Sequence, residues 1–101
     1  MVANVLTIEG GDPQAREAAV RNLNETVVPQ LRQAPGFVAA YWLTGGSGKR
    51  LTVVIWQDAQ SLEASEAQMK ERREQTLSEF GMRITSTERY EVVAHAEMAT
   101  A

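Results

Sequence analysis

The sequence predicts an α+β fold, in which a four-stranded antiparallel sheet carries two helices on one face. Three observations lead to this prediction: two central apolar runs joined by a glycine-rich turn, a helical pattern on each side of them, and a short apolar run near each end. The order strand, helix, strand, strand, helix, strand, with right-handed crossovers, gives a ferredoxin-like βαββαβ arrangement. The length of 101 residues predicts a single domain over 1–101.

The first strand and helix are marked by their boundaries. Val2 to Ile8 is rich in β-branched residues and predicts a strand. Asp12–Pro13 supplies an N-cap followed by a proline at the first helical position. Pro29 is expected to kink the helix, and Pro35–Gly36 to end it. The apolar stripe of this helix comprises Ala15, Ala19, Leu23, Val27 and Leu31.

A hairpin and a second helix follow. Phe37 to Leu43 and Leu51 to Trp56 are too short and too rich in β-branched and aromatic residues to favour helices. Between them, Gly45–Gly48 can adopt the positive φ angles of a hairpin turn. Asp58 is expected to cap the second helix and Gly81 to end it.

The second helix is predicted to bury one stripe and to pair some charges on its polar face. Glu66 and Lys70 are four residues apart in the favourable order, which predicts an ion pair between them. Glu88 to Ala96 is expected to form the last strand, and 96–101 a flexible tail. The stripe of the second helix comprises Leu62, Ser65, Met69, Thr76 and Phe80.

The two central strands are apolar on both faces. Strict alternation divides the first of them into Phe37, Ala39, Tyr41 and Leu43 against Val38, Ala40 and Trp42. It divides the next into Leu51, Val53 and Ile55 against Thr52, Val54 and Trp56. Two helices cover only one face, so the other leaves an apolar surface on the order of several hundred Å², which is unusual for a monomer. We expect a second copy to cover it, sheet against sheet, in a homodimer.

Composition excludes several classes of protein. A net charge of −3 argues against a nucleic-acid partner. The N-terminus lacks the pattern of a signal peptide and no apolar run reaches membrane-spanning length, so the expectation is a cytoplasmic protein without membrane contact. The absence of cysteine and the single histidine leave no ligand set for a metal.

Several local motifs together resemble the antibiotic biosynthesis monooxygenase (ABM) family of the dimeric α+β barrel superfamily. They are Val28–Pro29, Pro35–Phe37, Val54–Asp58, Ser61–Ala64 and Glu88–Val93. The resemblance implies a homodimer with a ligand pocket between helices and sheet. It also implies a cofactor-independent monooxygenase that acts on a phenolic or quinol-type aromatic substrate. The alternative is a non-catalytic barrel that binds a small apolar molecule or serves as an accessory protein.

A heme-degrading branch of the superfamily uses an Asn in the first strand together with a Trp and a His in the second helix. Asn4 resembles the first of these, but the second helix contains neither Trp nor His, which excludes heme degradation. Asn4 then has two interpretations. It hydrogen-bonds a ligand carbonyl or phenolate, or it satisfies a backbone group at a strand end.

Cofactor-free oxygenation requires an apolar pocket with a few polar groups. The candidate catalytic residues are Asn4, Arg89 and His95. His95 alone has a side chain with an unperturbed pKa near neutrality, but its place at the end of the last strand also fits an exposed or interfacial residue. Trp56 also fits a core or interface position. The candidate pocket residues are Tyr41, Trp42, Trp56 and Tyr90.

Overall fold

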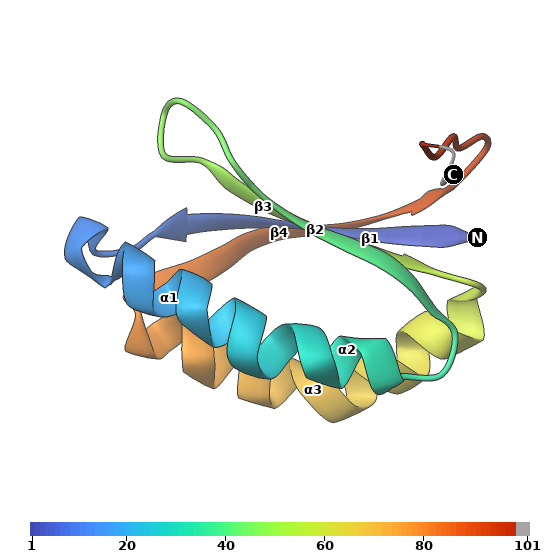
Figure 1. Cartoon of the computed structure of the whole chain (residues 1–101), viewed down its shortest axis with the longest axis horizontal. Helices are drawn as coiled ribbons and strands as arrows, with labels where there is room; N and C mark the ends of the chain where they lie inside the picture. Colours follow the sequence, from blue (N-terminus) through green and yellow to red (C-terminus); the bar gives the residue numbers. More distant parts are fainter. Residues whose placement is uncertain (99–101) are drawn as a thin grey trace.

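The computed structural model describes residues 1–98 and has the predicted fold, a ferredoxin-like α+β arrangement (Figure 1). The sheet is antiparallel throughout, with the strand order β2-β3-β1-β4. All helices lie on one face of it. The strands are β1 (Val2–Gly10), β2 (Phe37–Thr44), β3 (Arg50–Trp56) and β4 (Met82–Glu91).

The first helical segment runs in four pieces because of its two prolines. They are η1 (Pro13–Ala15), α1 (Arg16–Asn22), η2 (Leu23–Val27) and α2 (Val28–Gln33). The Asp12 side chain caps the start by accepting a hydrogen bond from the Gln14 N–H, as predicted. The piece η2 is a π-helix that ends two residues before Pro29, which has no N–H to donate along the helix. The predicted irregularity at Pro29 is therefore a widened turn.

The turn after α2 depends on Gly36. Its φ of 80° lies in the left-handed region, where residues other than glycine are strained. A Cβ atom at this position would clash with Ser61 Oγ, on the helix that follows β3. Gly36 therefore brings the end of the first helical segment close to the start of the next helix.

We expect Gly36→Ala to lower the free energy of unfolding by about 2 kcal/mol or more, because it adds a steric clash to a left-handed backbone. Gly46→Ala in the hairpin is the matched control, because a Cβ there meets nothing within 4 Å. The control should change stability by less than about 0.5 kcal/mol. Urea unfolding of both variants checks this, and equal midpoints would contradict it.

The second helix, α3 (Ala59–Glu79), follows the hairpin as predicted. Asp58 Oδ1 accepts a hydrogen bond of 2.7 Å from the Ser61 N–H, and this bond holds the pKa of Asp58 below its ordinary value. The chain turns at Gly81, which has a φ of 72°. No helix within residues 1–98 is long and apolar enough to cross a membrane.

The last strand is the element whose predicted boundaries were wrong. It begins at Met82, six residues before the predicted Glu88, and ends at Glu91, five before Ala96. The strand ends at Glu91 because its neighbour β1 begins at Val2, the residue paired with Glu91. Beyond this pair, the Val92 N–H donates a hydrogen bond to the Met1 carbonyl. Residues 92–98 leave the sheet on the side away from the helices (Figure 1). Of the predicted tail, 99–101 lie outside the described residues.

A bulge in β2 changes which side chains face the helices. The register pairs Phe37 with Trp56 and Ala39 with Ile55, so the intervening Val38 is the extra residue. Phe37 therefore lies on the face of Trp42, contrary to the strict alternation predicted, and packs edge-on against Trp56 at a ring distance of 5.9 Å. The core cluster on this face comprises Leu31, Val54, Trp56 and Leu62, with Phe37, Ala40 and Trp42 packed against it.

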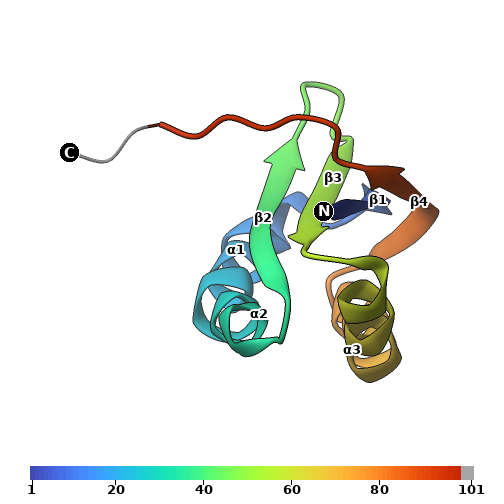
Figure 2. The same cartoon turned by 90° about the vertical axis from the view of Figure 1, so that its right-hand side faces the viewer.

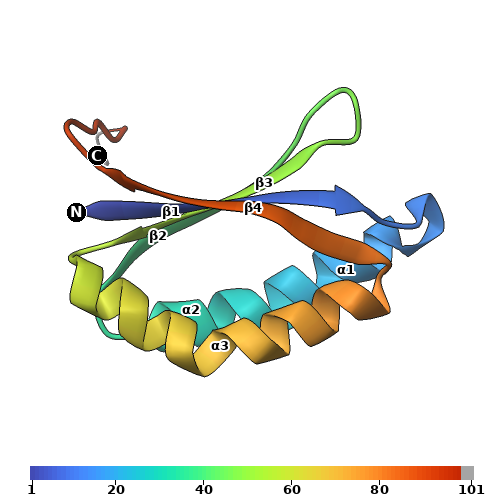
Figure 3. The same cartoon turned by 180° about the vertical axis from the view of Figure 1, so that it is seen from behind.

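The opposite face of the sheet is apolar, as predicted. The register places Tyr41, Val53 and Val5 in one row across three strands. Ala39, Ile55 and Ala3 form the next row. Tyr41 is 57% exposed, and no helix covers this face (Figure 3). We call this surface the outer face, and it comprises Ala3, Val5, Ala39, Tyr41, Leu43, Leu51, Val53, Ile55 and Tyr90.

Candidate functional site

A cavity of about 570 Å³ lies between the sheet and the helices. Figure 2 shows its setting end-on: α1 and α2 run beneath β2, whereas α3 runs beneath the side of the sheet that holds β1 and β4. Both helical segments and the inner face of the sheet contribute side chains to the lining. The volume falls within the range of roughly 300–1,000 Å³ that is typical of small-molecule sites. Much of the lining is apolar, including Leu6, Leu23, Trp42, Trp56, Met69 and Phe80.

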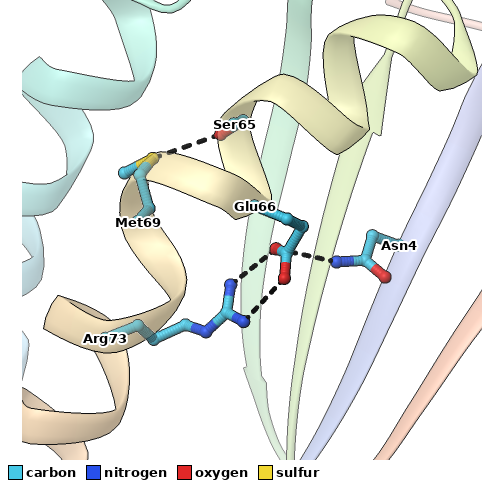
Figure 4. A network of polar contacts seen from close by, with 5 residues as sticks. All are labelled: Asn4, Ser65, Glu66, Met69 and Arg73. Atoms are coloured by element: carbon cyan, nitrogen blue, oxygen red, sulfur yellow. Dashed lines mark hydrogen bonds and ion pairs between the residues drawn. The ribbon is translucent and has the colours of Figure 1, made fainter.

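A cluster of polar side chains lies at the lining of this cavity, in contrast to its apolar walls. Asn4 from β1 meets Glu66 and Arg73 from α3 (Figure 4). Glu66 accepts hydrogen bonds from Arg73 Nη1 at 2.8 Å and Nη2 at 2.9 Å, which form a bidentate ion pair. Asn4 Nδ2 donates to Glu66 Oε1 at 3.3 Å. We call these three residues the polar triad.

The polar triad is charged but well shielded. Asn4 is 2% exposed, and the side chains of Glu66 and Arg73 are about one quarter exposed. The hydrogen bonds from Arg73 hold the pKa of Glu66 below its ordinary value, against the opposing effect of burial. Glu66 is therefore ionised at neutral pH, and it is a poor general base because its pKa is low.

Two buried atoms of the polar triad have no hydrogen-bond partner within residues 1–98. They are Asn4 Oδ1, which is an acceptor, and Arg73 Nε, which is a donor. Buried polar atoms in native proteins are nearly always paired, with protein, water or ligand. The cluster therefore has the capacity to accept one hydrogen bond and to donate one.

Three of the sequence-predicted site residues line the cavity with buried or half-buried side chains. They are Asn4, Trp42 and Trp56. Trp56 also belongs to the core cluster, so the expected core position is correct. Tyr41 borders the cavity from β2, but it belongs to the outer face and is mostly exposed.

The other predicted site residues lie away from the cavity. Arg89 stands opposite Asn4 on β4, where it is exposed and pairs with Glu63 at 3.3 Å. Tyr90 is on the outer face and donates a hydrogen bond to Glu88. His95 is exposed and follows the end of β4, so its predicted place at the end of a strand is wrong. Arg89 is thus the cross-strand neighbour of Asn4 but is not among the residues that line the cavity, whereas His95 lies beyond the end of the sheet.

Sequence reasoning missed Glu66 and Arg73. It assigned Glu66 to an exposed ion pair with Lys70, whereas Glu66 turns inward and pairs with Arg73. A signal was present, because both residues fall on the repeat of Leu62, Met69 and Phe80 along the helix. A carboxylate and a guanidinium seven residues apart on an otherwise apolar stripe indicate an inward-facing pair. No group of three or more metal-binding side chains occurs over the described range.

No protein-family model matches the chain, and no curated protein matches it by sequence. The likenesses are therefore structural.

Solved structures share the fold over most of their length. A monooxygenase from the gene ActVA-Orf6 of Streptomyces coelicolor, in complex with nanaomycin D, has a TM-score of 0.66 at 16% identity, over 99% of this chain and 92% of that one. An antibiotic biosynthesis monooxygenase has a TM-score of 0.65 at 19% identity, over 91% and 99%. A dimeric ferredoxin-like protein from an uncultured marine organism has a TM-score of 0.71 at 14% identity, over 97% and 100%.

The chain has the fold of the antibiotic biosynthesis monooxygenases. The resemblance drawn from the sequence motifs is thereby confirmed for the fold. With sequence identities below 20%, the activity of these proteins cannot be assigned to this chain from the shared fold. The features of this chain that bear on function are the cavity and the polar triad.

Proposed function

We propose that the protein is a cofactor-independent monooxygenase, which oxidises a phenolic or quinol-type aromatic compound in the cavity. The observation that carries this proposal is the polar triad within a largely apolar cavity. An oxygenase needs polar groups where its substrate binds, whereas an apolar binding protein or an accessory protein does not. The ABM fold, which a monooxygenase from Streptomyces coelicolor shares, supports the same choice.

The charges around the cavity favour a substrate that ionises to an anion. Four arginines contribute to the lining, against the two carboxylates of Asp12 and Glu66. A neighbouring cation favours the anionic form of a phenol or of an acidic C–H group. The arginines are Arg16, Arg50, Arg72 and Arg73.

The proposed reaction uses molecular oxygen and the electrons of the substrate. An activated CH₂ group loses a proton to solvent, and the resulting anion passes one electron to oxygen. The radical pair combines to a peroxide anion, which takes a proton back from solvent, and the hydroperoxide then loses water, so that R₂CH₂ and O₂ give R₂C=O and H₂O. The protein binds and orients the aromatic rings and favours the anion. The catalytic roles of Arg89 and His95 stay predictions from the sequence.

Oxygen consumption with a panel of anthrones, which carry the reactive CH₂ group, tests the proposal. We expect uptake with one oxygen consumed per ketone formed, and we expect Asn4→Leu to slow it at least tenfold, because an oriented polar contact is lost. Gln75→Leu, on an exposed position of α3, is the control and should retain the activity. Thermal stabilisation by these compounds without oxygen uptake would instead favour the non-catalytic binding protein.

We also propose that a second copy covers the outer face. The face is apolar over β2, β3 and the first half of β1, and it is uncovered within the chain. Burying several hundred Å² of it on each copy is worth on the order of 10 kcal/mol before the costs of association. The dimeric ferredoxin-like protein of the same fold supports this assembly. A cytoplasmic location and the absence of a nucleic-acid partner stay predictions from the sequence.

A further inference from the structure

The direction of the Asn4 side-chain amide is fixed by the two charged residues next to it. An ionised carboxylate accepts hydrogen bonds and donates none. Glu66 is held in that form by the bidentate pair with Arg73. The Asn4 amide must therefore turn its NH₂ group toward Glu66, at 3.3 Å (Figure 4). The reverse orientation would place the carbonyl oxygen Oδ1 against a carboxylate oxygen.

This orientation leaves Asn4 Oδ1 as a buried acceptor. It has no donor within the part of the chain that the structure describes, although Asn4 is 2% exposed and lines the cavity. A buried acceptor without a donor is unfavourable, and such atoms in native proteins are satisfied by water or ligand. The donor is then expected from the contents of the cavity.

We propose that Asn4 Oδ1 accepts a hydrogen bond from a hydroxyl group of the ligand, and that Glu66 and Arg73 act as positioning residues that fix this polarity. The inference rests on the proposed function, since it assumes an aromatic ligand in the cavity. In this proposal Asn4 accepts a hydrogen bond from the ligand. A contact to a ligand carbonyl or phenolate would instead require Asn4 to donate one.

The polarity of Asn4 restricts the class of ligand. A hydroxyl that donates to Oδ1 stays protonated, because an oxyanion or a carbonyl at the same place would repel the amide oxygen. The position that ionises and reacts with oxygen must therefore lie elsewhere on the ligand. The structure thus favours a hydroxylated aromatic with a separate oxidisable position, and it disfavours a quinone or a methyl ether at the Asn4 contact.

Binding of three matched probes tests the proposal: 1-naphthol, 1-methoxynaphthalene and naphthalene, measured by calorimetry at pH 7. A phenol with an ordinary pKa near 10 is neutral at this pH. We expect the wild-type protein to bind 1-naphthol about tenfold more tightly than 1-methoxynaphthalene, the effect of one buried hydrogen bond. Naphthalene, which carries no oxygen, measures the contribution of the apolar walls.

Two variants test whether the preference for 1-naphthol over 1-methoxynaphthalene depends on the polar triad. In Glu66→Gln the new amide can donate as well as accept, so the Asn4 amide can reverse, and the 1-naphthol preference should fall to about twofold or less. Asn4→Leu removes the acceptor at similar volume and should abolish the preference without leaving Glu66 unpaired. A purely structural role would weaken both ligands equally and leave their ratio unchanged.

The outcomes separate the two proposals. Binding of naphthalene with equal affinities for 1-naphthol and its methyl ether would overturn the role of Asn4 alone, as would a preference that persists in both variants. Binding of none of the three probes by the wild-type protein would overturn the aromatic ligand, and the role of Asn4 with it.

Discussion

Replacing Val53 by Asp is expected to convert a two-chain species into single chains. Val53 lies in the middle of the outer face, between Tyr41 on β2 and Val5 on β1. In a two-fold dimer the substitution places two carboxylates in an apolar interface, where each is deprived of water. We expect dissociation to become easier by on the order of 1,000-fold, about 4 kcal/mol. Light scattering coupled to size-exclusion chromatography measures the mass.

The control for Val53→Asp adds the same charge to a surface that no copy is expected to cover. Gln75→Asp on α3 meets this need, because position 75 is exposed. It should leave the mass and the dissociation constant unchanged. A wild-type protein that is monomeric at micromolar concentration would exclude the outer face as a dimer interface.

Replacing Arg73 by Met should have the second large effect, on both stability and activity. Glu66 would lose its bidentate partner while its side chain is only 24% exposed. Leaving a shielded carboxylate unpaired costs about 2–3 kcal/mol in the free energy of unfolding. Oxygen uptake should fall at least tenfold, because Glu66 is no longer held in place and the Asn4 side chain loses the support of a fixed partner.

The pH dependence identifies the cause of this loss. The folded-state pKa of Glu66 lies below its unfolded value, so the ion pair stabilises fully above that unfolded value, near pH 4.5. The contribution is lost as the pH falls through the folded-state pKa. The difference in unfolding free energy between wild type and Arg73→Met should therefore shrink on acidification from pH 7. A difference independent of pH would show that packing of the Arg73 stem, not the charge, is responsible.

The double variant Glu66→Gln with Arg73→Met provides the matched control. It removes both charges, so no carboxylate is left unpaired. Much of the stability lost in Arg73→Met should return, because replacing both partners of a buried pair costs less than replacing one. The 1-naphthol preference should not return, since Asn4 would remain free to reverse.

Local signals in the sequence were sufficient for the order of the elements. Asp58 and Gly36 mark their boundaries through capping and backbone geometry that depend on the residue itself. The limits of the last strand were predicted wrongly because they depend on pairing with β1 and not on a local sequence signal. Only Met82 and Ile84 interrupt a polar run before Glu88, and the strand ends where β1 offers no further partner.

The site was less accessible to sequence reasoning than the fold. Asn4, Trp42 and Trp56 were identified because their residue types and strand positions are informative. The bulge at Val38 shifts Phe37 to the inner face, and no local pattern specifies it. Glu66 and Arg73 were missed because charged residues on a helix are usually solvated, although their spacing places both on the apolar stripe that α3 turns inward.

The cavity also affects how the protein persists in a cell. Few apolar side chains are fully buried, and Leu6 and Leu62 are the largest of them, so the interior is built around a space rather than filled. A compound bound there acts as part of the hydrophobic core. At 100 times its dissociation constant it adds about 2.7 kcal/mol to the free energy of unfolding. Resistance to proteolysis, and with it the cellular level of the protein, is then expected to follow the supply of its own ligand.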